Sequence, residues 1–100
     1  LVPTANMTPY DFVADVTVRS RAFENQCYVA YANYCGHEED IHYCGQSSIA
    51  APDGSRIALA GLDEALISGT LDRQLMLDSR AINRYFHDRR PELYDDLNKR

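Results

Sequence analysis

A helix-favouring segment that runs directly into a strand-favouring segment is the feature that most constrains how this chain can fold. Residues 19–26 are charged and favour a helix, whereas residues 27–33 alternate in polarity and favour a strand. No glycine or proline separates the two segments. A helix that passes into a strand through a short turn is the basic unit of a layered α/β protein, so the sequence predicts the α/β class.

The rest of the chain divides into short elements around this junction. Thr8, Pro9 and Asp11 predict a helix start with Thr8 as the cap, and the residues from Pro52 to Ser55 predict a hairpin turn. The polar, acidic segment 37–42 is predicted to be a loop. The predicted strands are 1–4, 27–34, 47–51, 56–60 and 65–71, and the predicted helices are 8–26 and 72–85.

Length and charge restrict the kinds of function. One hundred residues allow one domain or part of one, and the first residues, Leu1 to Thr4, read as the end of a strand. We therefore expect residues 1–100 to be the C-terminal portion of a single, longer domain. The net charge of -5 argues against nucleic acid or an anionic membrane as partner, because phosphate binding needs a basic surface.

The three cysteines are an odd number and are not spaced as a disulfide framework, which indicates free thiols in a reducing, cytoplasmic compartment. A zinc-binding module is one alternative, because Cys35, His37, His42 and Cys44 could supply four ligands. Their spacing is not a common zinc pattern, and packed cysteines with surface histidines are the simpler interpretation. Cys27 and Cys44 lack a nearby glycine-rich nucleophile turn, so structural roles are favoured for them.

The predicted helix 8–26 is apolar on more than one face, since Val18 and Ala22 extend the stripe that contains Val16 and Phe23. A helix of this kind is often packed between a sheet and another subunit. Arg21 and Glu24 are spaced to pair on its surface.

Five segments, in this order and at this spacing, make the chain resemble the nitrilase superfamily of carbon–nitrogen hydrolases. They span Pro3 to Ala5, Arg19 to Gln26, Tyr28 to Gly36, Gly45 to Gly54 and Asp88 to Tyr94. The resemblance implies the C-terminal part of a four-layer αββα sandwich. The short loops and the form Pro3-Thr4-Ala5-Asn6 favour the amidase branch.

The resemblance also implies a cysteine hydrolase that needs no metal or organic cofactor. Its Glu-Lys-Cys triad is expected upstream of Leu1, so we assign no catalytic residue to this chain. The expected substrate is a small linear amide, or a nitrile, and Ala5 and Asn6 are expected at the edge of its pocket. A homodimer is expected across the 10–26 helix through Phe12, Val16, Arg19 and Phe23. A non-catalytic fragment or pseudo-enzyme that contributes an oligomer interface is the alternative.

Overall fold

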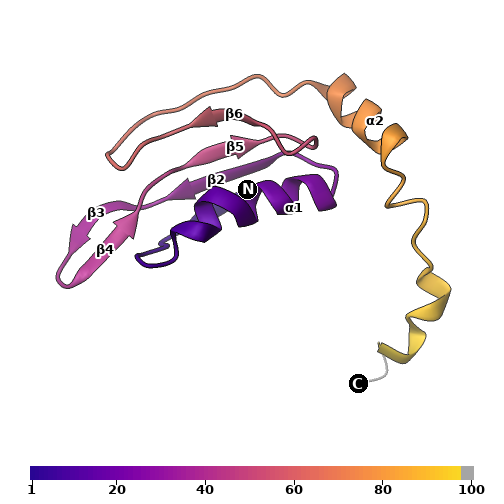
Figure 1. Ribbon diagram of the computed structural model, residues 1–100, viewed down its shortest axis with the longest axis horizontal. Coiled ribbons are helices and arrows are strands. Elements are labelled where there is room, and N and C mark those ends of the chain that lie inside the picture. The colour runs from indigo at the N-terminus through magenta and orange to yellow at the C-terminus, as the bar shows by residue number, and fades with distance from the viewer. Residues whose placement is uncertain (98–100) are drawn as a thin grey trace.

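The computed structural model describes residues 1–97, and in it the predicted helix leads through a turn at one end of the sheet into the predicted strand (Figure 1). A π-helical segment, η1 (Val13–Thr17), continues into helix α1 (Val18–Glu24). Gln26 adopts a left-handed backbone conformation with φ of 48°, and strand β2 (Val29–Asn33) begins three residues later. The predicted short turn between helix and strand is therefore confirmed.

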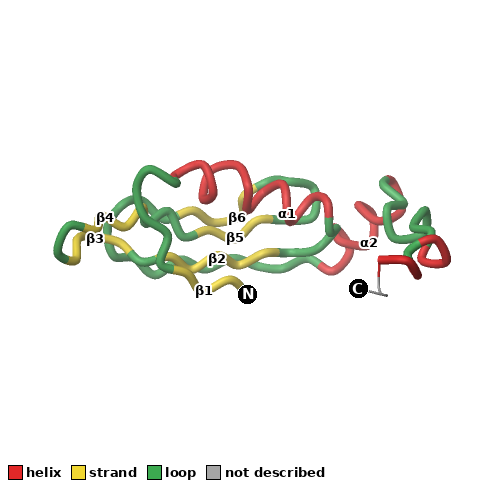
Figure 2. The backbone as a smooth tube through the Cα atoms, turned by 90° about the horizontal axis from the view of Figure 1, so that it is seen from below, coloured by secondary structure: helices red, strands yellow, loops and turns green. Residues whose placement is uncertain are grey.

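One sheet of four strands carries the fold, in the order β1-β2-β5-β6. Strand β1 (Val2–Thr4) is parallel to β2, whereas β5 (Ser48–Ala50) is antiparallel to β2, and β6 (Arg56–Leu59) is antiparallel to β5. Figure 2 shows helix α1 along one face of this sheet. One helical layer on one sheet is half of an αββα sandwich, in agreement with the predicted fold class.

Small residues bring the helix close to the sheet. Ala14, Val18 and Ala22 line one side of the η1–α1 helix and are buried against Tyr31 and Ala50. In β2, Tyr31 faces the helix and is buried, whereas its neighbour Ala32 on the opposite face is exposed. The alternation predicted for this strand is thus confirmed, and it fixes which residues form the core.

The predicted helix start is wrong. The helix begins at Asp11, and no side chain among residues 1–97 caps its start. The Thr8–Pro9 peptide is cis. The N–H and hydroxyl groups of Thr8 both donate to the carbonyl of His42, each at 2.9 Å, so Thr8 continues the pairing of residues 6–8 with the strand that contains His42 and lies outside the helix.

The predicted loop at 37–42 is instead a hairpin of β3 (Cys35–Glu38) and β4 (Ile41–Cys44). The His37 and His42 rings stack with their centroids 4.0 Å apart, and the Tyr43 hydroxyl donates to Glu38 at 2.9 Å. Glu39 supplies the positive φ, 52°, that a tight turn requires. Cross-strand pairs of polar side chains stabilise this hairpin, so it lacks the apolar alternation that would have identified it.

The predicted strand 65–71 is also wrong, because within residues 1–97 this segment pairs with no other strand. It still lies close to the sheet, since a methyl group added at Gly69 would come within 3.1 Å of Ile57. Helix α2 (Arg73–Ile82) follows, and the carboxylate of Asp72 caps it by accepting from the Gln74 N–H at 2.8 Å. Short 3₁₀ turns η2 (Pro91–Leu93) and η3 (Asp95–Leu97) end the described chain.

The face of the sheet opposite α1 is largely open. The radius of gyration of the whole chain, 16.3 Å, exceeds the value of about 13 Å that is typical of a compact 100-residue domain. An apolar groove of about 470 Å³ lies there between β1, β2, β5 and residues 65–67, and Leu66 beside it is 99% exposed. Unpaired apolar surface of this size favours association with other protein.

We therefore expect residues 1–100, expressed alone, to aggregate or to fold poorly, because the open sheet face stays in contact with water. Size-exclusion chromatography and thermal unfolding followed by circular dichroism provide the measurement. A monodisperse chain with one sharp cooperative transition would contradict this expectation.

Candidate active-site edge and helix groove

Asn6, one of the two residues predicted at a pocket edge, is held firmly just after β1. Its backbone N–H donates to Asn33 Oδ1 at 2.7 Å, and its carbonyl accepts from Asn33 Nδ2 at 3.1 Å and from the Cys44 N–H at 3.0 Å. Its own side chain donates to the Tyr10 carbonyl at 2.9 Å. The other predicted residue, Ala5, is exposed beside it.

Asn33, at the end of β2, joins three parts of the chain at this point. Besides pairing with Asn6, its Nδ2 donates to the Gly45 carbonyl at 3.0 Å. The hydroxyl of Ser47 accepts from the Asn33 N–H at 2.9 Å and lies 3.4 Å from the Asn33 carbonyl. A hollow of about 100 Å³ adjoins Asn33, Gly45 and Ser47. The end of β1, the end of β2 and the exit from β4 are therefore bonded together.

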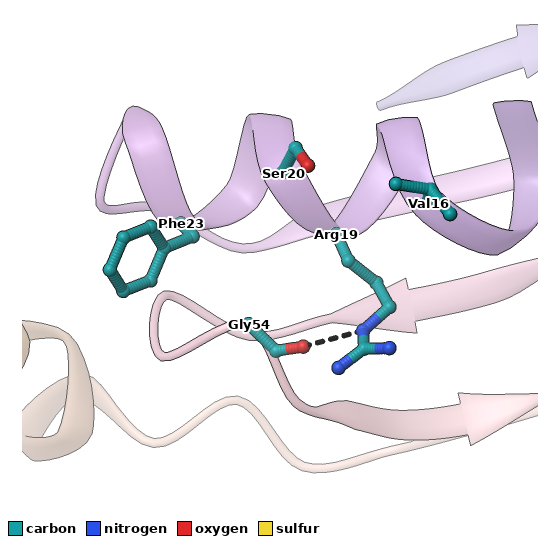
Figure 3. Close-up of a pocket in the computed structure, with 5 residues that line it drawn as sticks. All are labelled: Val16, Arg19, Ser20, Phe23 and Gly54. Carbon is teal, nitrogen blue, oxygen red and sulfur yellow. Dashed lines mark hydrogen bonds between the residues drawn. The ribbon is translucent and has the colours of Figure 1, made fainter.

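The four residues predicted for a subunit interface differ in their surroundings. Phe12 is 65% exposed and Val16 is 38% exposed, whereas Phe23 is half-buried. Val16, Arg19 and Phe23 line a groove of about 240 Å³ beside the β5–β6 turn. Figure 3 shows Arg19 extending from the helix towards Gly54 in that turn, where its Nε donates to the Gly54 carbonyl at 2.8 Å. Three of the four predicted residues therefore lie beside one groove, and Phe12 lies outside its lining.

Two contacts lie at the C-terminal end of this helix. Arg21 and Glu24 form the predicted ion pair at 2.7 Å, and both side chains are exposed. The Phe23 ring meets the Tyr85 ring edge to face, with centroids 6.1 Å apart. The exposed ion pair contributes little to stability, so the apolar side chains are the more informative part of this surface.

The cysteine–histidine cluster does not form a metal site in the described part of the chain. Cys35 lies opposite Cys44, and His37 opposite His42, along the β3–β4 hairpin. Among residues 1–97, no group of three or more histidine, cysteine or acidic side chains is arranged to hold a metal ion. Stacked histidine rings present their faces, not their ring nitrogens, to one another.

Cys44 has the surroundings of a structural thiol. It is buried, and burial, followed by the nearby Asp11 carboxylate, raises the pKa of its thiol. A raised pKa leaves less of the reactive thiolate at neutral pH. This agrees with the structural role that the sequence indicated for Cys44.

Sequence reasoning missed the part that Asn33 plays. Its strand position, in phase with Val29 and Tyr31, shows that the side chain faces the helix side of the sheet. A side-chain amide at such a position needs hydrogen-bond partners, so its presence there could have indicated a structural hydrogen-bonding role. The partners themselves lie 27 and 12 residues away along the chain, so the sequence could not identify them.

Comparison with known proteins identifies the family to which this chain is similar. The family model described as carbon-nitrogen hydrolase matches residues 4–81. A protein of Pseudomonas protegens named "Hydrolase in pqqF 5'region" is 88% identical over 100 residues, which is all of this chain and 35% of that protein. The 2-oxoglutaramate amidase of Bacillus subtilis is 36% identical over 75 residues, which is 75% of this chain and 29% of that protein.

Among solved structures, an amidase of the nitrilase superfamily from Nesterenkonia AN1 superimposes with a TM-score of 0.78 at 30% identity. The match covers 96% of this chain and 33% of the amidase. A mutant of that amidase carries the acetamide moiety of fluoroacetamide on its active-site cysteine. The chain thus spans about a third of the length of these relatives.

None of the helices in the described part of the chain has the length and apolar character needed to cross a bilayer.

Proposed function

The chain belongs to the carbon–nitrogen hydrolase family, and we propose on that premise that it forms the C-terminal portion of a cytoplasmic enzyme that hydrolyses a small linear amide. The match to the family model over residues 4–81 is the observation that carries this proposal. The amidases of Bacillus subtilis and Nesterenkonia support the choice of an amide over a nitrile.

The proposed reaction uses a cysteine outside these 100 residues. Its thiolate attacks the amide carbon, and a glutamic acid delivers a proton to the departing nitrogen. The carbon–nitrogen bond breaks, ammonia is released, and the acyl group remains on the cysteine as a thioester. Water, deprotonated by the same glutamate, then attacks the thioester, releases the carboxylic acid and restores the thiol. A lysine stabilises the oxyanion in both steps. The cysteine adduct of the Nesterenkonia amidase supports a cysteine nucleophile.

In this proposal residues 1–97 supply part of the frame of the pocket. Asn6 and Ala5 lie at its edge, because they follow β1 at the point where the Asn33 side chain of β2 and the Cys44 N–H of β4 bond to Asn6. The backbone N–H and carbonyl of Asn6 are both held by hydrogen bonds, so the position of this edge is fixed. A fixed edge restricts the length and shape of the acyl chain that fits.

Ammonia release by the intact protein tests this function. The panel contains short linear amides of two to six carbons, the matching nitriles, and carbamoyl amino acids. We expect ammonia from the amides, with lower or no turnover of the other two classes. No ammonia from any of the three classes, with a correctly folded protein, would contradict the proposal.

We further propose that the exposed surface of the η1–α1 helix binds the same surface of a second copy. Phe12 and Val16 leave apolar area in water, and the groove beside Arg19 offers a shape into which a partner side chain fits. Homodimers commonly use one self-complementary patch of this kind.

Replacing Val16 by Asp places a charge in that apolar surface, and we expect the dissociation constant of the dimer to rise at least about tenfold. Sedimentation velocity over a range of concentrations measures it. Ile82→Asp is the matched control, because Ile82 is an apolar residue that is 80% exposed on α2. A wild-type protein that stays monomeric, or equal effects of the two substitutions, would contradict the proposed interface.

A further inference from the structure

Asn33 bonds to Asn6 in the way that a neighbouring strand would. The last backbone pair between β1 and β2 is Thr4 with Asn33. Two residues further along, the Asn33 side chain accepts from the Asn6 N–H at 2.7 Å and donates to the Asn6 carbonyl at 3.1 Å. A side-chain amide has the same donor and acceptor as a peptide group, so Asn33 extends the pairing beyond the end of β1.

The third bond makes this arrangement specific to asparagine. The second N–H of Asn33 Nδ2 donates to the Gly45 carbonyl at 3.0 Å, so both amide protons and the amide oxygen are used. Rotating the amide by 180° would place its oxygen against two carbonyl oxygens. An aspartate of the same shape could accept from Asn6 but could donate to neither carbonyl.

Gly45 lies in a closely packed part of the backbone. Its φ is +58°, and a Cβ built on it would lie 3.0 Å from the Gly61 carbonyl oxygen and 3.1 Å from that of Leu62. The Gln46 N–H also donates to the Gly61 carbonyl at 2.9 Å. Asn33 therefore joins Asn6 to a part of the backbone that is itself tightly packed.

We propose that Asn33 is a positioning residue that sets the location of Asn6 and thereby the shape of one edge of the substrate pocket. The presence of a substrate pocket beside Asn6 rests on the proposed function, whereas the positioning of Asn6 rests on the three hydrogen bonds of the Asn33 side chain. Asn33 acts on the substrate through Asn6 and through the Asn6–Tyr10 segment, to which the Asn6 side chain is bonded.

The test compares Asn33→Asp and Asn33→Ala in the intact protein, with Asn25→Ala as the control. Among residues 1–97, Asn25 Nδ2 donates to the Arg21 carbonyl alone, within its own helix end. Hydrogen exchange of peptides that cover residues 5–10 is the first readout, and residues 48–59 are the internal reference. We expect about tenfold faster exchange at the Asn6 amide in both Asn33 variants, with β5 and β6 unchanged.

The second readout is kcat and KM for propionamide and hexanamide. We expect kcat/KM to fall about 10- to 100-fold in Asn33→Asp, mainly through KM, with a changed ratio between the two amides. The Asn25 variant should match the wild type in both readouts.

The outcomes separate this inference from the proposed function. Unchanged exchange at Asn6 would overturn the positioning role. Faster exchange with unaltered kinetics in an active enzyme would overturn the link to the pocket. A wild-type protein that hydrolyses neither amide would refute the proposed function, and the exchange rates would still decide whether Asn33 positions Asn6.

Discussion

Replacing Gly45 by Ala is expected to lower the free energy of unfolding of the intact protein by about 2–5 kcal/mol. Two effects act together at this position. The backbone has a φ of +58°, which disfavours any residue with a Cβ, and the new methyl group would lie within 3.0 to 3.2 Å of backbone atoms of Gly61 and Leu62. Backbone atoms cannot move aside as a flexible side chain can, so the surrounding loop has to shift.

Gly36→Ala is the matched control for this prediction. Gly36 also has a positive φ, +83°, but a Cβ there meets no atom within 4 Å. We expect a loss of only about 1–2 kcal/mol, which is the conformational effect without the steric one. Urea unfolding monitored by circular dichroism gives both values. Equal losses at the two glycines would show that close packing around Gly45 has no energetic consequence.

Truncation of Tyr31 is the second large effect, because this residue fills the space between the helix and the sheet. Tyr31 is 3% exposed and packs with Ala14, Val18, Ala22 and Ala50. All of these neighbours are small or rigid, so they cannot close over the missing ring. We expect Tyr31→Ala to destabilise the protein by about 3–5 kcal/mol in the same urea experiment.

Tyr31→Phe is the control, since it keeps the ring and removes only the hydroxyl. That hydroxyl is buried without a hydrogen-bond partner among residues 1–97, and burial raises the pKa of the phenol. Removing an unpaired buried polar group costs little or stabilises, so we expect a change of less than about 1 kcal/mol. A loss as large as that of the alanine variant would mean that the hydroxyl makes a bond in the intact protein.

The parts of the fold that the sequence predicted correctly are those determined by local patterns. The junction at residues 24–29 and the turn at Pro52–Ser55 each depend on residues that are adjacent in the chain. The order and spacing of five segments indicated the family, which the comparisons then confirmed. Alternation along β2 placed Val29, Tyr31 and Asn33 on one face, and the structure shows that Tyr31 is buried there.

The errors occurred where distant residues decide the local structure. Thr8 had the sequence signature of a helix cap, but a carbonyl 34 residues away accepts both of its donors. Residues 37–42 looked like a loop because the hairpin is held by His37, His42 and other polar pairs that carry no apolar period. Asn33 had an unremarkable position in the sequence, and its importance depends on Asn6 and Gly45.

We propose that residues 1–100 frame the pocket of a cysteine amidase whose nucleophile lies elsewhere in the intact protein. The decisive experiment labels the intact protein with one equivalent of fluoroacetamide and maps the modified peptides. We expect loss of amidase activity, with the acetamide group on one cysteine outside residues 1–100 and with Cys27, Cys35 and Cys44 unmodified. Inactivation that maps to any of these three cysteines would show that the nucleophile lies within this chain.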